Sequence, residues 1–132
     1  MSALALATAA AIEGKAPAQP INATSHWRAG DGAARLGKLD GAHTGVGFGT
    51  HLAATIFWAS LFEGWMSARP TRSNNAIVGR SVAVAALAAM VDYTITPKRF
   101  TPGWELVLSK RAMASGYLAM AAGFTWAQRL IR

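Results

Sequence analysis

The stretch from Thr44 to Met66 reads TGVGFGTHLAATIFWASLFEGWM and is the longest strongly apolar part of the chain. Its first nineteen residues, Thr44 to Phe62, contain no Asp, Glu, Lys or Arg, and His51 is the one residue among them that could carry a charge. An α-helix needs about 20 consecutive apolar residues to cross the roughly 30 Å of hydrocarbon in a bilayer. The stretch therefore predicts a membrane-spanning helix, which we place at residues 44–67.

Two further apolar stretches follow on the C-terminal side. Residues 76–97 are rich in Ala and Val, and Pro97-Lys98-Arg99 is a natural stop for a helix there. Residues 108–129 include seventeen uncharged residues in a row, from Ala112 to Gln128. The short polar segment around Pro70 predicts that the first two of these three helices are antiparallel.

The N-terminal side is less clear. Residues 1–14 begin with twelve uncharged, mostly apolar residues, which is too short for a full span. They could be the core of a signal peptide, although no Lys or Arg precedes them. They could also be a half-buried, Ala-rich helix. We favour a short first membrane helix, or the end of one that begins upstream.

Residues 15–43 form the longest polar segment and are expected to be a loop. Within it, Thr24 or Ser25 is expected to cap a short interfacial helix that continues to Ala34. Farther along, Thr101 is expected to cap the restart of a helix after the second apolar stretch, with Pro102 at its first position.

The composition agrees with a membrane protein. Charged residues make up 14% of the chain, against about 25% in ordinary soluble proteins, and hydrophobic residues make up 52%. The net charge is +7, from 13 Lys and Arg against 6 Asp and Glu. The cations never exceed two in a row and lie between the apolar stretches, as they do in proteins that face anionic head groups. The sequence therefore predicts one domain, 1–132, with an all-α fold: a small transmembrane helical bundle of three clear spans plus a short first helix.

The cations also give a small orientation preference. Eight of them fall on one face of the predicted membrane and five on the other. The richer face is expected to be cytoplasmic. The two sets are Lys15, Arg28, Arg35, Lys38, Lys98, Arg99, Lys110 and Arg111 against Arg69, Arg72, Arg80, Arg129 and Arg132.

Small residues recur every four positions on two of the predicted spans. Such a stripe lets a neighbouring helix approach closely in a membrane, and the spacing Gly-x-x-x-Gly is a familiar form of it. We therefore predict helix-packing faces at Gly45, Gly49 and Ala53 and at Ser115, Ala119 and Gly123.

Ionisable side chains within predicted spans are costly and usually face protein or water. His51 lies about seven residues into its span and Asp92 about five residues from the end of its own. At about 1.5 Å of rise per residue, antiparallel helices place both at a similar depth, and Tyr117 falls at the same level. We predict one polar cluster of these three residues. By the same argument, Glu63 and Arg80 form an interfacial ion pair near the opposite face.

These polar groups have a plain structural interpretation and a functional one. Buried polar side chains pair to avoid being left unsatisfied, and such interhelical pairs contribute only about 0.6 kcal/mol each. This interpretation is favoured for both sets. A role of His51 and Asp92 in handling protons or a ligand is the alternative.

Several kinds of chemistry are excluded or find no support. The chain has no cysteine, which excludes disulfides, thiolate metal sites and cysteine nucleophiles. The glycines at 45, 47 and 49 are not followed by Lys-Ser/Thr, as a phosphate loop requires. His26 and His43 have no evident partners for a metal. We therefore predict no catalytic residue, metal or cofactor.

Part of the sequence resembles an uncharacterised family of small proteobacterial inner-membrane proteins, across roughly residues 20–128. The stretches that carry the resemblance are Pro20–Trp27, His43–Gly45, His51, Phe57–Ala59, Val91–Tyr93, Pro97–Arg99 and Thr101–Glu105. The resemblance implies a four-helix protein of the bacterial inner membrane whose first helix is longer than the one here. It implies no activity and no catalytic residue.

We therefore expect a multi-pass inner-membrane protein that is not an enzyme and serves as a structural or accessory subunit. Its expected partners are the lipid bilayer and other membrane subunits or further copies of itself. The alternative is a stand-alone small transporter or proton-handling protein that uses the pair His51 and Asp92. A soluble DNA-binding module is disfavoured because the cations are dispersed, and no nucleic acid partner is expected.

Overall fold

The computed structural model describes residues 1–131, and all regular secondary structure within them is helical. Within these residues, six α-helices and four 3-10 or π-helical turns follow one another. In order they are α1 Ser2–Ile12, α2 Gln19–Ala23, α3 His26–Ala29, η1 Asp31–Arg35, α4 Thr44–Ala68, α5 Asn74–Met90, η2 Val91–Ile95, η3 Lys98–Phe100, η4 Trp104–Leu106 and α6 Lys110–Leu130.

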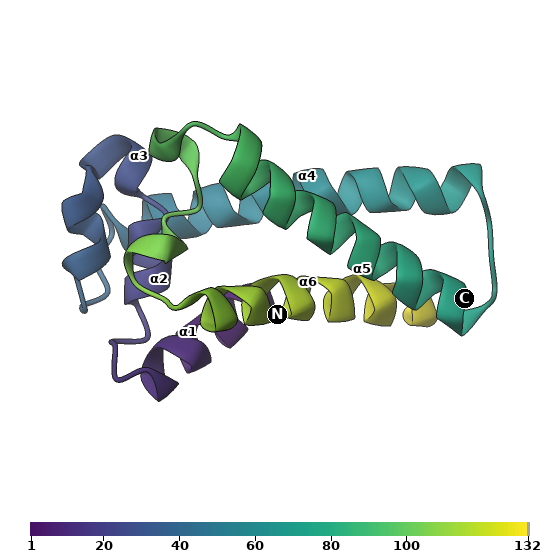
Figure 1. Ribbon diagram of the computed structural model, residues 1–132, viewed down its shortest axis with the longest axis horizontal. Coiled ribbons are helices and arrows are strands. Elements are labelled where there is room, and N and C mark those ends of the chain that lie inside the picture. The colour runs from purple at the N-terminus through teal and green to yellow at the C-terminus, as the bar shows by residue number, and fades with distance from the viewer. Residues whose placement is uncertain (132) are drawn as a thin grey trace.

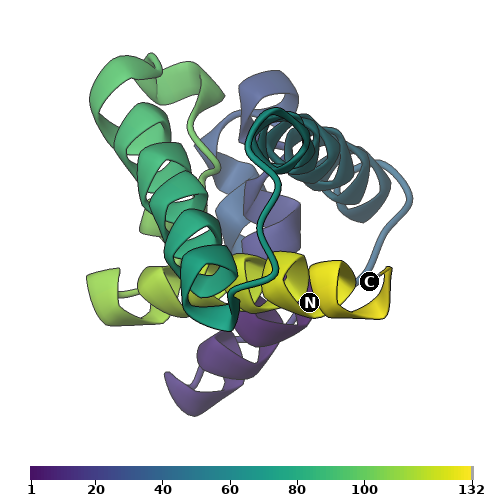
Figure 2. The same cartoon turned by 90° about the vertical axis from the view of Figure 1, so that its right-hand side faces the viewer.

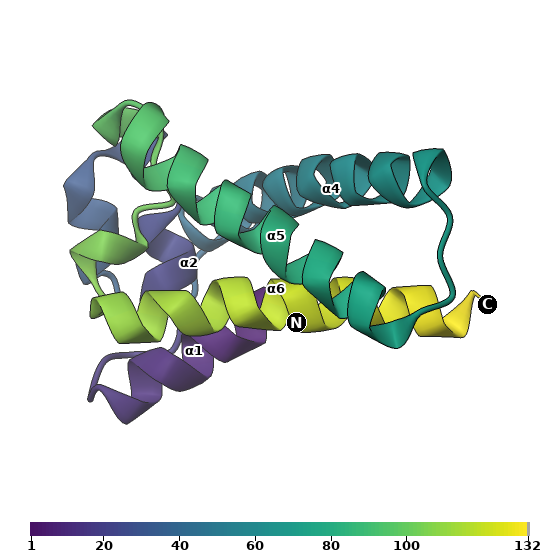
Figure 3. The same ribbon diagram turned by 45° about the vertical axis from the view of Figure 1, so that its right-hand side comes forward.

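The three long helices α4, α5 and α6 make up the length of a bundle (Figure 1). The segments 13–43 and 96–109 gather at one end of it, which we call the loop end. The short connection 69–73 and the C-terminal end of α6 lie at the opposite end. Helix α1 is short and lies along the first half of α6, so the N terminus sits beside the middle of α6 (Figure 3).

Local sequence explains where the last two long helices begin. The Ser73 hydroxyl accepts a hydrogen bond from the Ala76 N–H at the start of α5. The Ser109 hydroxyl does the same for the Ala112 N–H at the start of α6. Each serine satisfies one of the backbone donors that the first turn of a helix leaves unpaired.

The core lies where these helices meet. The rings of Phe62 from α4 and Phe124 from α6 are stacked, with centroids 5.0 Å apart. Ile77 of α5 is fully buried beside them in the same core cluster. Leu6 of α1 is also fully buried, and it packs so closely on Gly116 that a Cβ there would come within 2.8 Å of the Leu6 side chain. Viewed along the bundle, α1 and α4 lie on opposite sides of α6 (Figure 2).

The all-helical bundle is confirmed, but the prediction of three clear spans is not. Helix α4 and the continuous helical run Asn74–Ile95 are each long and apolar enough to cross a membrane by length and composition. Helix α6 has 21 residues but does not reach the same apolarity. The physical reason is its composition, since it begins with Lys110-Arg111 and ends with Gln128-Arg129.

Two local predictions at the loop end are wrong. The helix expected to run to Ala34 is interrupted at Gly30, whose φ of 78° lies in the left-handed region that favours glycine. The helix expected to restart at Thr101 is instead a single turn, η4, which follows Gly103 at φ 79°. Helix α6 begins only at Lys110.

The small-residue stripe on α4 is not used within this chain. Gly45 and Gly49 have open space where a Cβ would lie, and Ala53 is exposed. The close approach is at Gly47, between them, where a Cβ would lie 1.9 Å from the Ile21 carbonyl oxygen of α2. On α6, the residues Ser115, Ala119 and Gly123 are half-buried, with Ser115 and Ala119 next to α1.

Candidate functional site

His51 lies in the second turn of α4, near the loop end, and is half-buried. Its Nε2 is hydrogen-bonded to the Ser2 hydroxyl of α1 at 2.9 Å. Its ring centroid is 5.8 Å from that of Trp104, with the two planes tilted by 51°. The ring therefore links the first turn of α1 to the turn η4.

Asp92 and Tyr117 are directly bonded. The Tyr117 hydroxyl donates a hydrogen bond of 2.7 Å to Oδ2 of Asp92. Asp92 belongs to the π-helical turn η2, which the hydrogen bond from the Thr96 N–H to the Val91 carbonyl closes at 2.9 Å. No other residue within 1–131 donates a hydrogen bond to this carboxylate, so its Oδ1 is free to meet a ligand.

His51, Asp92 and Tyr117 line the same cavity, which has a volume of about 360 Å³. The structure does not pair His51 with Asp92 directly, because each has its own partner. The three residues therefore share a level in the bundle, which residue counting along the helices predicts. The direction of each side chain about its helix axis does not follow from residue counting.

Aromatic side chains from five elements form much of the cavity wall. Trp104 of η4 is central, because its ring centroid lies 5.4 Å from that of Tyr117 and 5.8 Å from that of His51. The aromatic lining residues are Trp27, His51, Trp58, Phe100, Trp104 and Tyr117.

Threonines hold two of the tryptophans in place. The Trp27 indole N–H donates to the Thr50 hydroxyl at 3.2 Å, and the Trp104 indole N–H donates to the Thr24 hydroxyl at 3.2 Å. These bonds tie α3 to α4, and η4 to the residue that directly follows α2. Because both N–H groups are bonded, these indoles offer the cavity their ring surfaces rather than donors.

The charge of the cavity is one-sided. Asp92 is its one acidic lining residue, and neither Lys nor Arg is among the lining residues. The other polar lining side chains are hydroxyl groups and His51. Neither in the cavity nor anywhere else in residues 1–131 is a group of three His, Asp or Glu side chains arranged to hold a metal ion.

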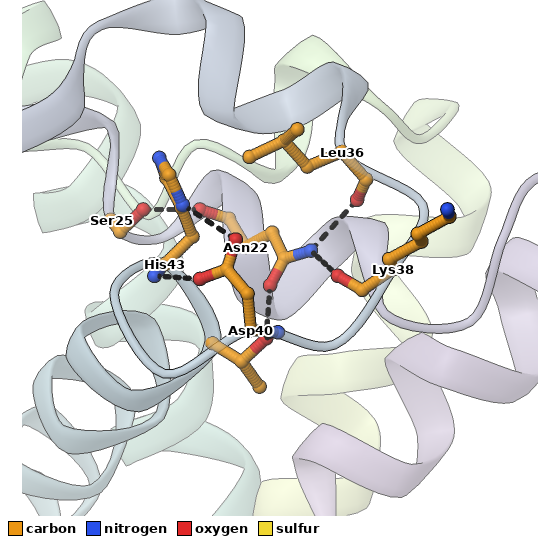
Figure 4. A network of polar contacts seen from close by, with 7 residues as sticks. Asn22, Ser25, Leu36, Lys38, Asp40 and His43 are labelled. Carbon is orange, nitrogen blue, oxygen red and sulfur yellow. Dashed lines mark hydrogen bonds and ion pairs between the residues drawn. The ribbon is translucent and has the colours of Figure 1, made fainter.

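A hydrogen-bond network around Asn22 fixes the position of α4 at the loop end (Figure 4). Asn22 is fully buried, and its amide NH₂ donates to the carbonyls of Leu36 at 2.7 Å and Lys38 at 2.9 Å. Its side-chain oxygen accepts from the hydroxyl of Thr44, the first residue of α4, at 2.6 Å. One amide therefore joins α2, the loop and the start of the helix that carries His51.

Asp40 extends this network next to the start of α4. Its carboxylate accepts hydrogen bonds from the His43 backbone N–H at 2.5 Å and from the His43 ring at 2.8 Å. These two bonds hold the pKa of the exposed Asp40 below its usual range. The turn before α4 is therefore stabilised most when Asp40 is ionised.

The predicted ion pair of Glu63 and Arg80 is wrong. Glu63 accepts a hydrogen bond of 2.6 Å from the Gln128 amide of α6. The Arg80 guanidinium donates to the Arg69 carbonyl and lies over the Trp65 ring, 5.5 Å from its centroid. Both residues lie at the end opposite the loops, as the depth argument implied, but they point to different neighbours.

Sequence reasoning missed several residues that build the site. Trp104 belongs to the helix start expected at Thr101, Asn22 lies in the expected polar loop, and Thr24 is expected only as a helix cap. Nothing in the sequence singles out Ser2. The aromatic residues that flank the spans were the available signal. Their convergence depends on how the loops fold back.

The comparisons with known proteins add no relative. No family model, curated protein or solved structure matches this chain.

Proposed function

We propose that this chain is a multi-pass protein of the bacterial inner membrane, in which α4, the run Asn74–Ile95 and α6 cross the bilayer. The surface of α4 is the observation that carries this proposal. Only 17% of its most apolar window is buried, whereas a core helix of a soluble protein is mostly buried. Water is a poor solvent for such a surface, and hydrocarbon is a good one.

The exposed apolar side chains continue across the neighbouring helices. On the run Asn74–Ile95 the buried share of the corresponding window is 28%. The large exposed side chains of the three helices include Phe48, Leu52, Ile56, Phe57, Leu61, Val78, Val82, Leu87, Leu118 and Trp126. A band of this kind matches the lipid-facing surface of a small bundle.

The orientation follows from the cations. All eight cations of the richer set belong to the loop-end segments or to the first turn of α6, which starts there. Of the other five, Arg69, Arg72, Arg80 and Arg129 belong to the opposite end, and Arg132 lies outside the described residues. The positive-inside rule then places the loop end in the cytoplasm.

Within this placement, the chain serves as a structural or accessory subunit of a larger membrane assembly and is not an enzyme. The supporting observation is the small-residue stripe of α4. A Cβ added at Gly45 or Gly49 would meet no atom of a neighbouring segment within 4 Å, so a helix of another subunit can approach the backbone there.

Purification of the tagged chain from its native membrane in mild detergent tests this role. We expect large partner proteins in fixed stoichiometry, and we expect Gly49→Leu to release them. Gly79→Leu is the matched control, because Gly79 of α5 is equally open but lies off the stripe. A clean, folded monomer or homo-oligomer from wild-type membranes would contradict the accessory role.

A second candidate function is favoured by the cavity. A stand-alone transporter or proton-handling protein would need polar groups within the bundle, and His51, Asp92 and Tyr117 share one cavity. Asp92→Asn separates the two candidates. If the site handles protons, the variant stays folded and loses a pH-dependent activity in proteoliposomes. If the polar groups only hold the helices together, the variant loses stability or assembly instead.

A further inference from the structure

The cavity beside Asp92 has walls of an unusual kind for this chain. Hydrophobic residues make up 52% of the sequence, yet no Leu, Ile or Val lines the cavity. Its large apolar surfaces come from aromatic rings, with Met120 as the one long aliphatic side chain. Aromatic walls drawn from α3, α4, η3, η4 and α6 point to recognition of a ligand.

The hydrogen-bond donors of the cavity are largely committed. Trp27 and Trp104 donate to threonines, and Tyr117 donates to Asp92. The ring nitrogen Nε2 of His51 is bonded to Ser2. An anion would therefore find neither Lys nor Arg in the lining, and the indole N–H of Trp58 is the one tryptophan donor there without a partner in residues 1–131. Besides that N–H, the groups that remain available are ring faces, which carry negative partial charge, and the unpartnered Oδ1 of Asp92.

These two features together select a positive charge. A cation above the face of Trp or Tyr gains about 0.5–2 kcal/mol per ring, most when water is excluded, and aromatic cages of this type bind quaternary ammonium groups. A small metal ion fits poorly because Asp92 supplies the one carboxylate, and the rings cannot replace the lost hydration shell. An organic cation brings its own apolar surface.

The size and access of the cavity suit such a ligand. Its volume of about 360 Å³ falls within the range of small-molecule sites. Its lining includes Phe100, which is 61% exposed, and Ala53, which is exposed on α4, so the cavity is open at its edge.

We propose that this cavity binds a hydrophobic organic cation, such as an aryl-substituted quaternary amine, with its charge between the Asp92 carboxylate and the rings of Trp104 and Tyr117. The inference deepens the second candidate function, on which it rests, by naming the class of ligand. Binding and transport are measured separately, so the two ideas can fail separately.

The test is a binding titration of the full chain in detergent at mildly alkaline pH. Calorimetry and tryptophan fluorescence measure the binding. The probe is benzyltrimethylammonium. Its uncharged isostere neopentylbenzene and the similarly sized anion benzenesulfonate are the comparison ligands, each used at matched free concentration. We expect saturable binding of the cation and affinities at least about tenfold weaker for both comparison ligands, because cation–π and carboxylate contacts depend on the charge.

Variants then assign the contacts. Asp92→Asn and Trp104→Leu should each weaken cation binding about tenfold or more, whereas Glu63→Gln, an equally conservative change outside the cavity, should leave it unaltered. Equal affinity of the wild-type chain for the cation and its uncharged isostere would overturn the proposal without any variant. Unaltered binding in a folded Asp92→Asn protein would also overturn it. Proteoliposome transport assays test the second candidate function independently. If the protein binds the cation but does not transport it, the proposed binding site stands and the transport function is wrong.

Discussion

Asn22 shows how much of this molecule depends on one uncharged side chain. Its amide satisfies two loop carbonyls and the first hydroxyl of α4, and no part of it is exposed. Asn22→Asp keeps the shape but replaces the NH₂ donor by an oxygen that faces both carbonyls. We expect a loss of at least about 2 kcal/mol in the free energy of unfolding, since buried acceptors would lose their donor.

Thermal unfolding in detergent, followed by circular dichroism, measures this loss. Asn75→Asp is the control, because Asn75 is exposed in the first turn of α5, where a negative charge is tolerated or favourable. It should change stability by no more than about 0.5 kcal/mol. Similar melting of the two variants would show that the Asn22 network contributes little.

Alanine substitutions at two glycines of α4 are expected to change the stability of the protein in opposite directions. A Cβ at Gly47 would overlap the Ile21 carbonyl of α2, so Gly47→Ala must push α2 and α4 apart. We expect a loss of about 1–3 kcal/mol, as for other overpacked contacts. At Gly49 the space is open, and alanine is the better helix former by about 0.5–1 kcal/mol, so Gly49→Ala should raise the melting temperature.

These two variants differ by two positions in the same helix, so each controls for the other in a single series of melting curves. If Gly47→Ala were as stable as the wild type, the close contact between α2 and α4 would be wrong. The loop end would then pack less tightly than the structure shows.

Glu13 links the end of α1 to the start of α6. Its carboxylate accepts hydrogen bonds from the Ser109 hydroxyl and, at 3.1 Å, from the Ser109 backbone N–H. These bonds lower the pKa of Glu13, although the group is exposed. A carboxyl group with a lowered folded-state pKa adds stability above its unfolded pKa of about 4.3, and this stability is lost as the pH falls through the folded value.

The expected result is a pH-dependent difference between the wild type and Glu13→Gln. The variant should melt at a lower temperature near neutral pH, and the difference should close as acid protonates the wild-type carboxyl group. A difference of the same size across the whole pH range would contradict the ionised link between Glu13 and Ser109.

The elements also show what sequence reasoning could and could not determine. The long stretches with few charged residues predicted the positions of α4 and the run Asn74–Ile95, because an apolar stretch of that length is typical of a membrane-spanning helix. Counting residues placed His51, Asp92 and Tyr117 at one level. Depth alone could not say that His51 bonds Ser2, or that Glu63 meets Gln128 rather than Arg80. Those contacts depend on rotation about each helix axis and on loops whose paths are set by Gly30, Gly103 and Asn22.

The proposed membrane placement is tested on the whole molecule by cysteine labelling, because the chain contains no cysteine of its own. Ile56→Cys on the exposed face of α4 should resist a water-soluble maleimide in intact membranes, because lipid covers it. Leu39→Cys at the loop end should react only with a reagent that enters the cytoplasm, and Pro70→Cys at the opposite end should react from outside.

Each site reports on a different part of the proposal. Fast labelling of Ile56→Cys in intact membranes would contradict the proposal that this face of α4 contacts lipid. Exchange of the Leu39 and Pro70 patterns would reverse the orientation and leave the spans in place.

The π-helical turn Val91–Ile95 has a consequence for changes in chain length. A π turn contains one residue more than the matching α-helical turn, so the chain has a spare residue just after Asp92. Deletion of Thr94 would restore an ordinary turn and keep Asp92 beside Tyr117. Deletion of Ala86, upstream, would rotate Asp92 by about 100° about the helix axis and take it away from the cavity. Loss of one codon just after Asp92 should therefore preserve the contact between Asp92 and Tyr117, whereas loss of one codon before Asp92 should break it.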